Sequence, residues 1–500
     1  AVVSKQDNTF RGTGFGVGNL THETTARAVI SFLNLTNTAP NPQAEIRHTR
    51  RDFDNSDSPT AVAYTPLGDT LLVTLQGNNQ VVGLDALGIQ QVDSDNTTGS
   101  TLTSPVVRTI EAGTGLSPQG LLIDATSNRL FTQDFMGRTV TVRNAQPLLG
   151  ENRTTLPLIA TTNTVTTELL TTQVLQGKRI FYNAADPRMS ADSYISCATC
   201  HVDGGHDGRV WDFTGRGEGL RRTTDLRGRS GIGHGAVHWS GNFDEIQDFE
   251  HDIRGPFGGT GFLTLSPQQF ATQHPSPASG KTGLSADLDA LAAYVTSLTP
   301  EHTPRSPNRN TNGTLTAAAV SGQAVFAAQN CASCHAGTGF INDTLMNVGT
   351  QSTLSGSRLG QTLPGIDTPT LHGLHATRVY LHHGQAANLS EVFSYAGGAL
   401  TYGSTGQYVG PAGTISDSPA EGGGGAIRGM FGGAAAYLND TGTASVRFTG
   451  IDGGCGGNAR IAFRYVRHYN SGTANLIING VSQSITTLQQ SPDNSWQTSG

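Results

Sequence analysis

The chain has 500 residues, a formal net charge of −7 and 14% charged residues. This negative balance argues against nucleic acid as a partner, and the lack of any run of about 18 apolar residues predicts no membrane span. The 64 glycines and the many Thr, Ser, Asn and Gln residues favour loop-rich β domains of an exported protein over a cytosolic helical one.

Residues 1–150 carry short β-strand signals that occur as two similar units. Ser58-Pro59 opens the first unit and Ser117-Pro118 opens the second, and each continues through apolar and β-branched runs separated by turn signals. The unit resembles a blade of the seven-bladed, YVTN-repeat β-propellers. Because a ring needs about four to eight blades, we expect partial β-propeller blades that upstream residues or another chain complete. A small independent β domain is the alternative.

Two Cys-x-x-Cys-His motifs follow, and they use four of the five cysteines. This is the spacing of covalent haem c attachment, in which both thiols bond to the porphyrin and the histidine binds the iron. A thioredoxin-like pair needs no adjacent histidine, and a zinc site would need both pairs together. The sequence therefore predicts two covalently bound haem c groups. The residues that bind them are Cys197, Cys200, His201, Cys331, Cys334 and His335, with His201 and His335 as proximal iron ligands.

The segments around the motifs form an internal duplication, which predicts two mainly α cytochrome c lobes at residues 160–310 and 311–412. In each copy a helical stretch precedes the motif, and a histidine loop and a short acidic helix follow it. These helical stretches and loops are residues 177–181 and 238–241 in the first copy, and 322–326 and 380–384 in the second. Residues 287–298 form a further amphipathic pattern with a Pro300 stop, which predicts a helix.

Residues 420–500 return to β-strand signals and resemble the carbohydrate-binding jelly-roll modules of family 6 or 35. The matching segments are residues 434–442, 459–465, 474–480 and Ser495-Trp496. Such a β-sandwich normally has two more strands after that tryptophan, so we expect a truncated module. Cys455, in a glycine loop, is the cysteine left over, and we expect an inert thiol there. The expected fold is multidomain, with β-propeller-like blades, two cytochrome c lobes and a C-terminal β-sandwich.

Residues 160–412 resemble the bacterial di-haem cytochrome c peroxidase superfamily, which includes the methylamine-utilisation (MauG-like) enzymes. Besides the two motifs, the matching segments are Phe340-Ile-Asn-Asp, Asp367-Thr-Pro-Thr-Leu-His-Gly-Leu and residues 380–391. The resemblance implies one haem that stores an electron and carries two protein ligands, and another that reacts with peroxide. It also implies a Ca²⁺ ion between the lobes.

The sequence departs from this family at its distal iron ligands. No histidine lies about sixteen residues after His201, no methionine follows the helix at residue 389, and Met346 stands where the family has histidine. The candidate distal ligands are His238, His206 and His234 for the first haem, and His382, Tyr395 and Met346 for the second. Such a histidine can also be a purely structural hydrogen-bond donor.

Other side chains have candidate roles that the resemblance implies, each with a structural alternative. Glu245, Asp248 and Glu250 lie where the peroxidases place an acid that assists cleavage of the O–O bond, although acidic side chains on such a helix are often only solvated. Trp239 and Trp211 are candidate electron relays or packing residues. Arg221, Arg222 and Arg227 are candidate partners of haem propionates, or surface arginines. Of these, Glu245, Glu250 and Trp239 are the predicted catalytic residues.

The implied function is that of an exported di-haem c-type cytochrome with electron transfer and peroxidase-like oxidoreductase chemistry on hydrogen peroxide. Its expected partner is a redox protein or another copy of the chain. The alternative is a pure electron-transfer cytochrome at the cell surface or in a polymer, whose β modules dock it or bind glycan. Both predict a periplasmic or extracellular location, with the export signal upstream of this numbering.

Overall fold

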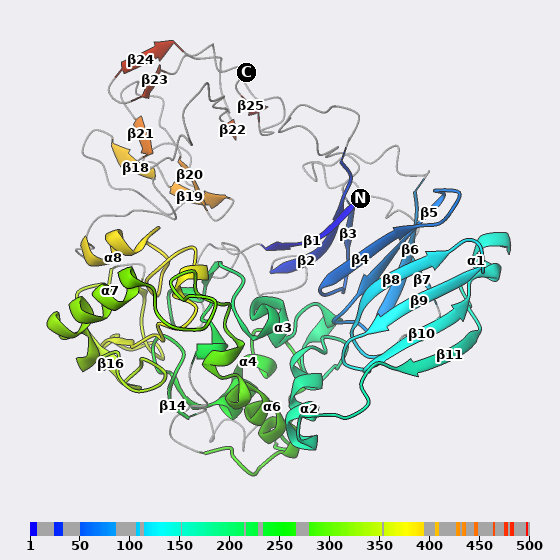
Figure 1. Ribbon diagram of the computed structural model, residues 1–500, viewed down its shortest axis with the longest axis horizontal. Coiled ribbons are helices and arrows are strands. Elements are labelled where there is room, and N and C mark those ends of the chain that lie inside the picture. Colours follow the sequence, from blue (N-terminus) through cyan, green and yellow to red (C-terminus); the bar gives the residue numbers. More distant parts are fainter. Residues whose placement is uncertain are drawn as a thin grey trace.

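A computed structural model gives the arrangement of the chain (Figure 1). It describes residues 1–7, 25–33, 51–86, 107–110, 115–151, 153–214, 217–228, 234–266, 280–352 and 355–394, and short strands beyond residue 405. The protein is multidomain and rich in small antiparallel sheets, with few helices. Within the described ranges no sheet closes into a barrel. The N-terminal sheets lie on one side of the molecule, and the helices of residues 172–394 lie on the other.

Three antiparallel sheets form the N-terminal part. The first contains β1 (Val2–Asp7), β2 (Ala26–Ser31) and β3 (Arg51–Phe53), with β2 in the middle. The second contains β4 (Pro59–Tyr64), β5 (Thr70–Leu75), β6 (Gln80–Asp85) and β7 (Val107–Ile110), each beside its neighbour in sequence. The third contains β8 (Pro118–Asp124), β9 (Arg129–Asp134), β10 (Thr139–Asn144) and β11 (Leu158–Asn163), with α1 (Gln146–Glu151) before β11.

The second and third sheets are copies of one unit, as the repeated sequence predicts. Ser58 and Ser117 open them with φ of 51° and 55°, and both first strands have a register shift directly after the proline. The turns between the second and third strands also match, at Asn79 with φ 56° and Arg138 with φ 57°. Positive φ is uncommon outside glycine, so its recurrence at equivalent positions indicates a true structural repeat. The third sheet continues to Asn163, past the limit expected at residue 150.

The first motif lies in a region whose described residues include four helices and two strand pairs. These are α2 (Thr172–Phe181), α3 (Cys197–Cys200), α4 (Glu250–Arg254) and α6 (Ala286–Ser297), with β12 (Val210–Asp212) beside β13 (Leu220–Arg222), and β14 (His234–Val237) beside β15 (Phe243–Glu245). Helix α6 matches the amphipathic pattern at residues 287–298. Thr171 and Ser285 cap α2 and α6 by accepting backbone N–H bonds with their side chains.

Helices α2 and α6 pack together and build the core of this region. Ile180 and Phe181 of α2 are buried with Leu291 and Tyr294 of α6, and the two aromatic rings meet edge to face at 5.0 Å. Gly177 is the residue that allows this packing, because a Cβ there would overlap the carbonyl group of Ala290.

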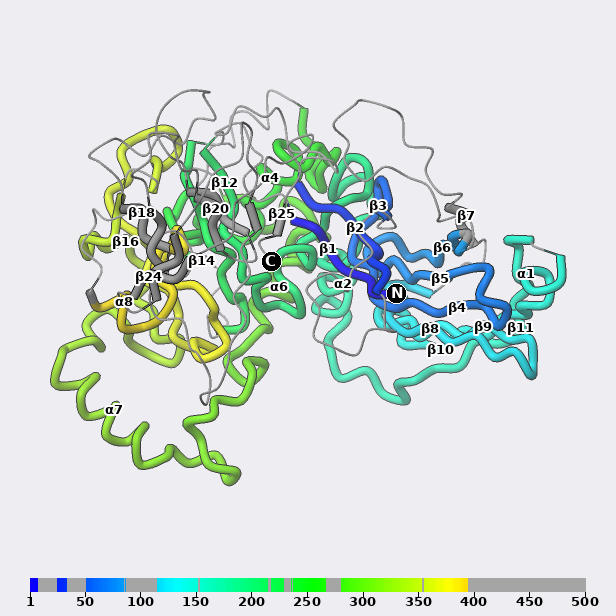
Figure 2. The backbone as a smooth tube through the Cα atoms, turned by 90° about the horizontal axis from the view of Figure 1, so that it is seen from above, coloured from blue at the N-terminus to red at the C-terminus, as the bar shows by residue number. Residues whose placement is uncertain are grey.

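The second motif lies in a region with less regular structure. It contains α7 (Ala317–Ala328), α8 (Leu389–Ser394) and the strand pair β16 (Leu345–Met346) with β17 (Ile366–Asp367). Helix α7 repeats the Gly-x-x-apolar-Phe pattern of α2, yet none of its side chains is buried, and Val325 is 60% exposed. In Figure 2, α7 lies at the periphery of the molecule, away from the sheets.

The described residues beyond 405 are short paired strands. They are β18 (Gly406–Val409), β19 (Ile427–Met430), β20 (Gly433–Ala436), β21 (Ser445–Phe448), β22 (Arg464–Tyr465), β23 (Asn475–Ile478), β24 (Val481–Ser484) and β25 (Gln497–Thr498). Cys455 lies outside the described residues. Among the helices of the described part, none has the length and apolar character of a bilayer span.

The N-terminal sheets contact the first-motif region through equivalent turns. The carbonyl of Gly77, after β5, accepts from the backbone N–H groups of Ala184 and Ala185. The turn after β9 places Met136 in the hydrophobic core beside α2. Because these turns occupy the same position in the two repeated units, the repeat presents one edge to the first motif.

Candidate haem-binding site

The first motif is a single helical turn with its own cap. Ser196 precedes helix α3, and its backbone N–H donates to Oγ1 of Thr199 at 2.8 Å. Cys197 and Cys200 are three residues apart and therefore lie on one face of the turn. The backbone N–H of His201 donates to the carbonyl of Cys197 at 2.9 Å and ends the helix. This turn presents both thiols together, as attachment to one porphyrin requires.

The imidazole of His201 is held in the tautomer that an iron ligand needs. Its Nδ1 lies 3.1 Å from the carbonyl oxygen of Gly205 and 3.0 Å from that of Thr224. Carbonyl oxygens only accept hydrogen bonds, so Nδ1 carries the proton and the lone pair is on Nε2. Iron-binding and zinc-binding histidines are generally fixed by such a bond from the other ring nitrogen.

The second motif repeats this arrangement in a different environment. The backbone N–H of His335 donates to the carbonyl of Cys331 at 3.0 Å, and its Nδ1 lies 2.9 Å from the carbonyl oxygen of Phe340. His335 is therefore in the same tautomer as His201. The residues between its cysteines, Ala332 and Ser333, are exposed, whereas Thr199 of the first motif is buried.

Buried arginines beside the first motif supply positive charge. Arg221 and Arg222 are 5% and 8% exposed, so the expectation of surface arginines is wrong for both. Arg221 pairs with Glu218 at 2.9 Å, but Arg222 forms no ion pair with any described residue, and its Nε has no acceptor. Burial lowers the pKa of Arg222 to about 10. A buried cation without an ion-pair partner is costly. Arg222 is therefore suited to pair with an acidic group of a bound ligand, such as a haem propionate.

These observations agree with two covalently attached haem groups. The cysteines lie on single turns, both histidines present Nε2, and Arg222 directly precedes the Thr223-Thr224 segment whose carbonyl holds His201. A shared zinc site does not fit, because in the described part of the chain no group of three or more His, Cys, Asp or Glu side chains is arranged to hold a metal ion. The implied Ca²⁺ ion likewise has no such acidic cluster among the described residues.

The candidate distal ligands of the first haem differ in their hydrogen bonds. His238 has φ 67°, its Nδ1 lies 2.8 Å from Oδ1 of Asn242, and its ring packs on Phe243 and Phe249. His206 accepts from the backbone of Gly208 through Nδ1 at 3.1 Å, which leaves the proton on Nε2. His238 therefore has the ligand tautomer and His206 has not. For His234 only the backbone pairing with Glu245 is described.

The two described candidates for the second haem differ in exposure. His382 is 1% exposed, and its Nε2 lies 2.7 Å from Oγ of Ser355. Met346 is 37% exposed on β16. Tyr395 lies outside the described residues.

Acid should destabilise the protein through His382. Burial, followed by nearby His383 and Arg221, lowers the pKa of His382 to about 2 from an ordinary 6.5. The unfolded chain therefore binds this proton first, and stability falls as the pH drops below about 6.5. We expect His382→Gln to flatten the fall of the melting temperature between pH 6.5 and 4, whereas His302→Gln, at an exposed site, leaves the curve unchanged. Parallel curves for all three proteins would contradict this.

The predicted catalytic carboxylates take part in structural hydrogen bonds. Glu250 accepts from the backbone N–H groups of Phe262 and Leu263 and pairs with Arg254 at 2.6 Å. Glu245 accepts from the backbone of Lys281 and from Thr282, and Asp248 pairs with Lys281 at 2.6 Å. Their role in peroxide chemistry stays a prediction. Such a role would require these carboxylates to break the hydrogen bonds that they make to two loops.

Trp239 connects the two copies of the duplication. Its Nε1 donates to the carbonyl of Arg222 at 2.7 Å, and its own carbonyl accepts from Asp367 at 2.8 Å. The indole lies 5.2 Å from the guanidinium of Arg222 and 6.3 Å from the ring of His382. Trp211 instead faces the N-terminal sheet, where its Nε1 donates to Asp207 at 3.0 Å.

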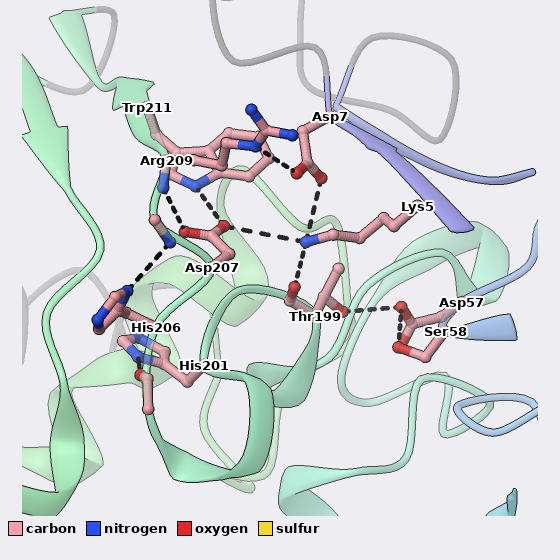
Figure 3. A network of polar contacts seen from close by, with 12 residues as sticks. Lys5, Asp7, Asp57, Ser58, Thr199, His201, His206, Asp207, Arg209 and Trp211 are labelled. Carbon is pink, nitrogen blue, oxygen red and sulfur yellow. Dashed lines mark hydrogen bonds and ion pairs between the residues drawn. The ribbon is translucent and has the colours of Figure 1, made fainter. Parts of the chain in front are cut away.

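The sequence alone did not reveal two residues that contact the first motif. Lys5 and Asp57, from the N-terminal part of the chain, both contact Thr199 (Figure 3). No motif or spacing points to them, because they are 194 and 142 positions away from Thr199.

No family model matches the chain, and no curated protein matches it. Similar solved structures include a hydrazine synthase from Kuenenia stuttgartiensis, at 22% identity and TM-score 0.32, covering 45% of this chain and 78% of that one. A diheme peroxidase from Burkholderia thailandensis has 16% identity and TM-score 0.30, covering 48% and 73%. A candidate 6-phosphogluconolactonase from Bacteroides fragilis has 15% identity and TM-score 0.18, covering 27% and 37%. Similarity at this level assigns neither family nor function.

Proposed function

We propose that the chain is a di-haem c-type cytochrome that transfers electrons and reduces peroxide. The observation that carries this proposal is the shared geometry of its two Cys-x-x-Cys-His motifs. In both, the histidine Nδ1 donates to a backbone carbonyl, so Nε2 is the nitrogen available to an iron. A haem held there supplies reversible one-electron chemistry, tuned by its ligands and surroundings.

Residues of the chain have distinct roles in this proposal. His201 and His335 bind and orient the two groups from the proximal side. Arg222 neutralises an acidic substituent near His201, and the core around Phe181 and Tyr294 keeps water from that side. His238 is the proposed distal ligand of the first haem, because its Nδ1 also faces an acceptor.

The different surroundings of the two motifs support different roles for the two haems in electron transfer. Ala332 and Ser333 of the second motif are exposed, so that an electron can pass there to or from a partner protein or another copy of the chain. Trp239 is the proposed connection between the copies, since its backbone and ring contact segments of both. The first motif, whose Ser196 and Thr199 are buried, then receives or stores the electron.

A pure electron-transfer cytochrome is the second candidate. The hydrogen bonds of Glu245 and Glu250 favour this second candidate. Each carboxylate is already bonded to a loop, and while that bond lasts it is not placed to move a proton. The two functions differ in iron coordination. Peroxide reduction needs an open or displaceable sixth position, whereas electron transfer alone is compatible with two six-coordinate irons.

The proposed domain organisation follows from the repeated sheets and the duplicated segments around the two motifs. We propose that the repeated four-stranded sheets are propeller blades and that residues 160–310 and 311–412 are the two cytochrome c lobes. Residues 420–500 are proposed to be a glycan-binding β-sandwich, in an exported protein of the periplasm or cell surface.

Spectroscopy of the oxidised protein tests this proposal. A pyridine haemochrome spectrum should show two thioether-linked haems per chain, and electron paramagnetic resonance should show at least one high-spin ferric iron that changes when peroxide is added. Two low-spin signals that peroxide leaves unchanged would favour electron transfer alone. A protein that binds no haem covalently when it is produced with a haem-attachment system would contradict both functions.

A further inference from the structure

Two residues of the N-terminal part, Asp57 and Lys5, contact the first motif, and we call these two residues the wall of that motif. Asp57, in the turn before β4, is buried and accepts hydrogen bonds from Oγ of Ser196 at 3.1 Å and from Oγ1 of Thr199 at 3.0 Å. Ser58 donates to the same carboxylate at 2.8 Å. Burial raises the pKa of the Asp57 carboxyl, whereas the hydroxyl groups of Ser58, Thr199 and Ser196 and the charge of Lys5 act in the opposite direction. Three hydroxyl donors around one carboxyl group favour the carboxylate anion, because an ionised oxygen only accepts. Asp57 therefore holds both ends of the turn that carries the cysteines.

A second contact reaches the same turn from strand β1. Nζ of Lys5 donates to the carbonyl of Thr199, directly before Cys200. Lys5 also pairs with Asp7 at 3.0 Å and lies 3.9 Å from Asp207, and Asp7 pairs with Arg209 at 3.2 Å. Figure 3 shows that Asp57 and Lys5 both contact Thr199, each through a different atom group. The first motif thus contacts one buried carboxyl group and one half-buried cation of the N-terminal part.

Among the described residues, the second motif has no equivalent of these two contacts. Ser333 corresponds to Thr199, but its hydroxyl donates to the nearby carbonyl of Asn330 at 2.8 Å and is exposed. In the described part of the chain, no carboxylate accepts from Ser333. The two motifs therefore share their local geometry and differ in what covers them.

We infer that Asp57 and Lys5 are positioning residues of the first haem, and that they make its reduction potential different from that of the second. This inference rests on the proposed function, because it concerns the haem attached to Cys197 and Cys200. The sheets are then part of a redox site instead of an appended module.

The charges of the two residues predict shifts of opposite sign. An anion near the iron stabilises the oxidised state, which carries one more positive charge, and a cation stabilises the reduced state. Asp57→Asn therefore raises the potential of the first haem, and Lys5→Gln lowers it. Loosening of the turn by itself would shift both variants in the same direction.

A redox titration of the haem-loaded protein, followed by the spectra of both haems, tests the first part. Only one of the two potentials should move, upward in Asp57→Asn and downward in Lys5→Gln. Asp54→Asn is the matched control, because Asp54 lies in the turn after β3, three residues before Asp57, but its side chain is 59% exposed beside Arg27. Shifts of the same sign, equal shifts of both haems, or an equal effect of Asp54→Asn would overturn the inference.

Thiol alkylation of the full chain produced without haem tests the wall independently of the proposed function. Cys197 and Cys200 should react more slowly than Cys331 and Cys334. Asp57→Ala should accelerate the first pair by about tenfold, the factor expected when roughly 1.4 kcal/mol of local stability is lost, and should leave the second pair unchanged. If the chain never acquires haem but this pattern of reactivity appears, the proposed function is wrong, and the contact of Asp57 with the first motif is still supported. Equal reactivity of the two pairs, unaffected by Asp57→Ala, would overturn the inference itself.

Discussion

A chain in which Cys197 and Cys200 are both replaced by alanine will carry one haem instead of two. Each motif presents its thiols on its own helical turn and its histidine on its own carbonyl anchor, so neither depends on the other for attachment. The haem absorbance per chain, measured as the pyridine haemochrome, should fall to about half, and the mass should fall by one haem. The same loss is expected for Cys331→Ala with Cys334→Ala.

The two double variants are controls for each other. Their remaining haems should differ in spectrum and in accessibility to external reductants, because Ser196 and Thr199 of the first motif are buried, whereas Ala332 and Ser333 of the second are exposed. Cys455→Ala, outside both motifs, should keep both haems. Full haem content in either double variant, or loss of haem in Cys455→Ala, would refute the assignment of the motifs.

Gly177→Ala will destabilise the protein, whereas the same replacement at Gly322 will stabilise it. Both glycines lie inside helices in the same sequence pattern. A Cβ at Gly177 would overlap the backbone of α6 at Ala290, but a Cβ at Gly322 would meet nothing within 4 Å. Overpacking at a close helix contact costs about 1–3 kcal/mol, while alanine gains roughly 0.5–1 kcal/mol over glycine within a helix.

Hydrogen exchange separates these two effects better than a single unfolding curve, because a multidomain protein does not unfold in two states. Amide protection in α2 and α6 should fall in Gly177→Ala, and protection in α7 should rise in Gly322→Ala. An effect of the same sign at both glycines would mean that α7 is packed like α2. That result would contradict the exposure of its side chains.

Much of the secondary structure could be predicted from local patterns. The amphipathic run at residues 287–298 became α6, and the stretches before the motifs became parts of α2 and α7. The repeated Ser-Pro units became two sheets with equivalent turns. These features depend on spacing within a few residues, where period and capping decide the conformation.

The surroundings of the site could not be predicted in this way. Successive residues of a strand usually alternate between buried and exposed, which favours surface positions for some arginines, yet Leu220, Arg221 and Arg222 are all buried in β13. That short strand lies between segments of both copies, which cover both of its faces. Likewise, Glu250 lies on an acidic helix that appears solvated in sequence, but the backbone of Phe262 and Leu263 folds over it.

The sequence by itself determined which chemistry is proposed for this protein, because thiol and imidazole groups at fixed spacing on one turn are typical of haem attachment and need no distant contact. Only the tertiary structure decided what surrounds each attachment site. Asp57 meets Thr199 across 142 positions, and Lys5 meets it across 194. Contacts of this kind arise from packing between whole sheets and helices, so no local sequence pattern predicts them. The same packing buries Ser196 and Thr199 of the first motif and leaves Ala332 and Ser333 of the second exposed.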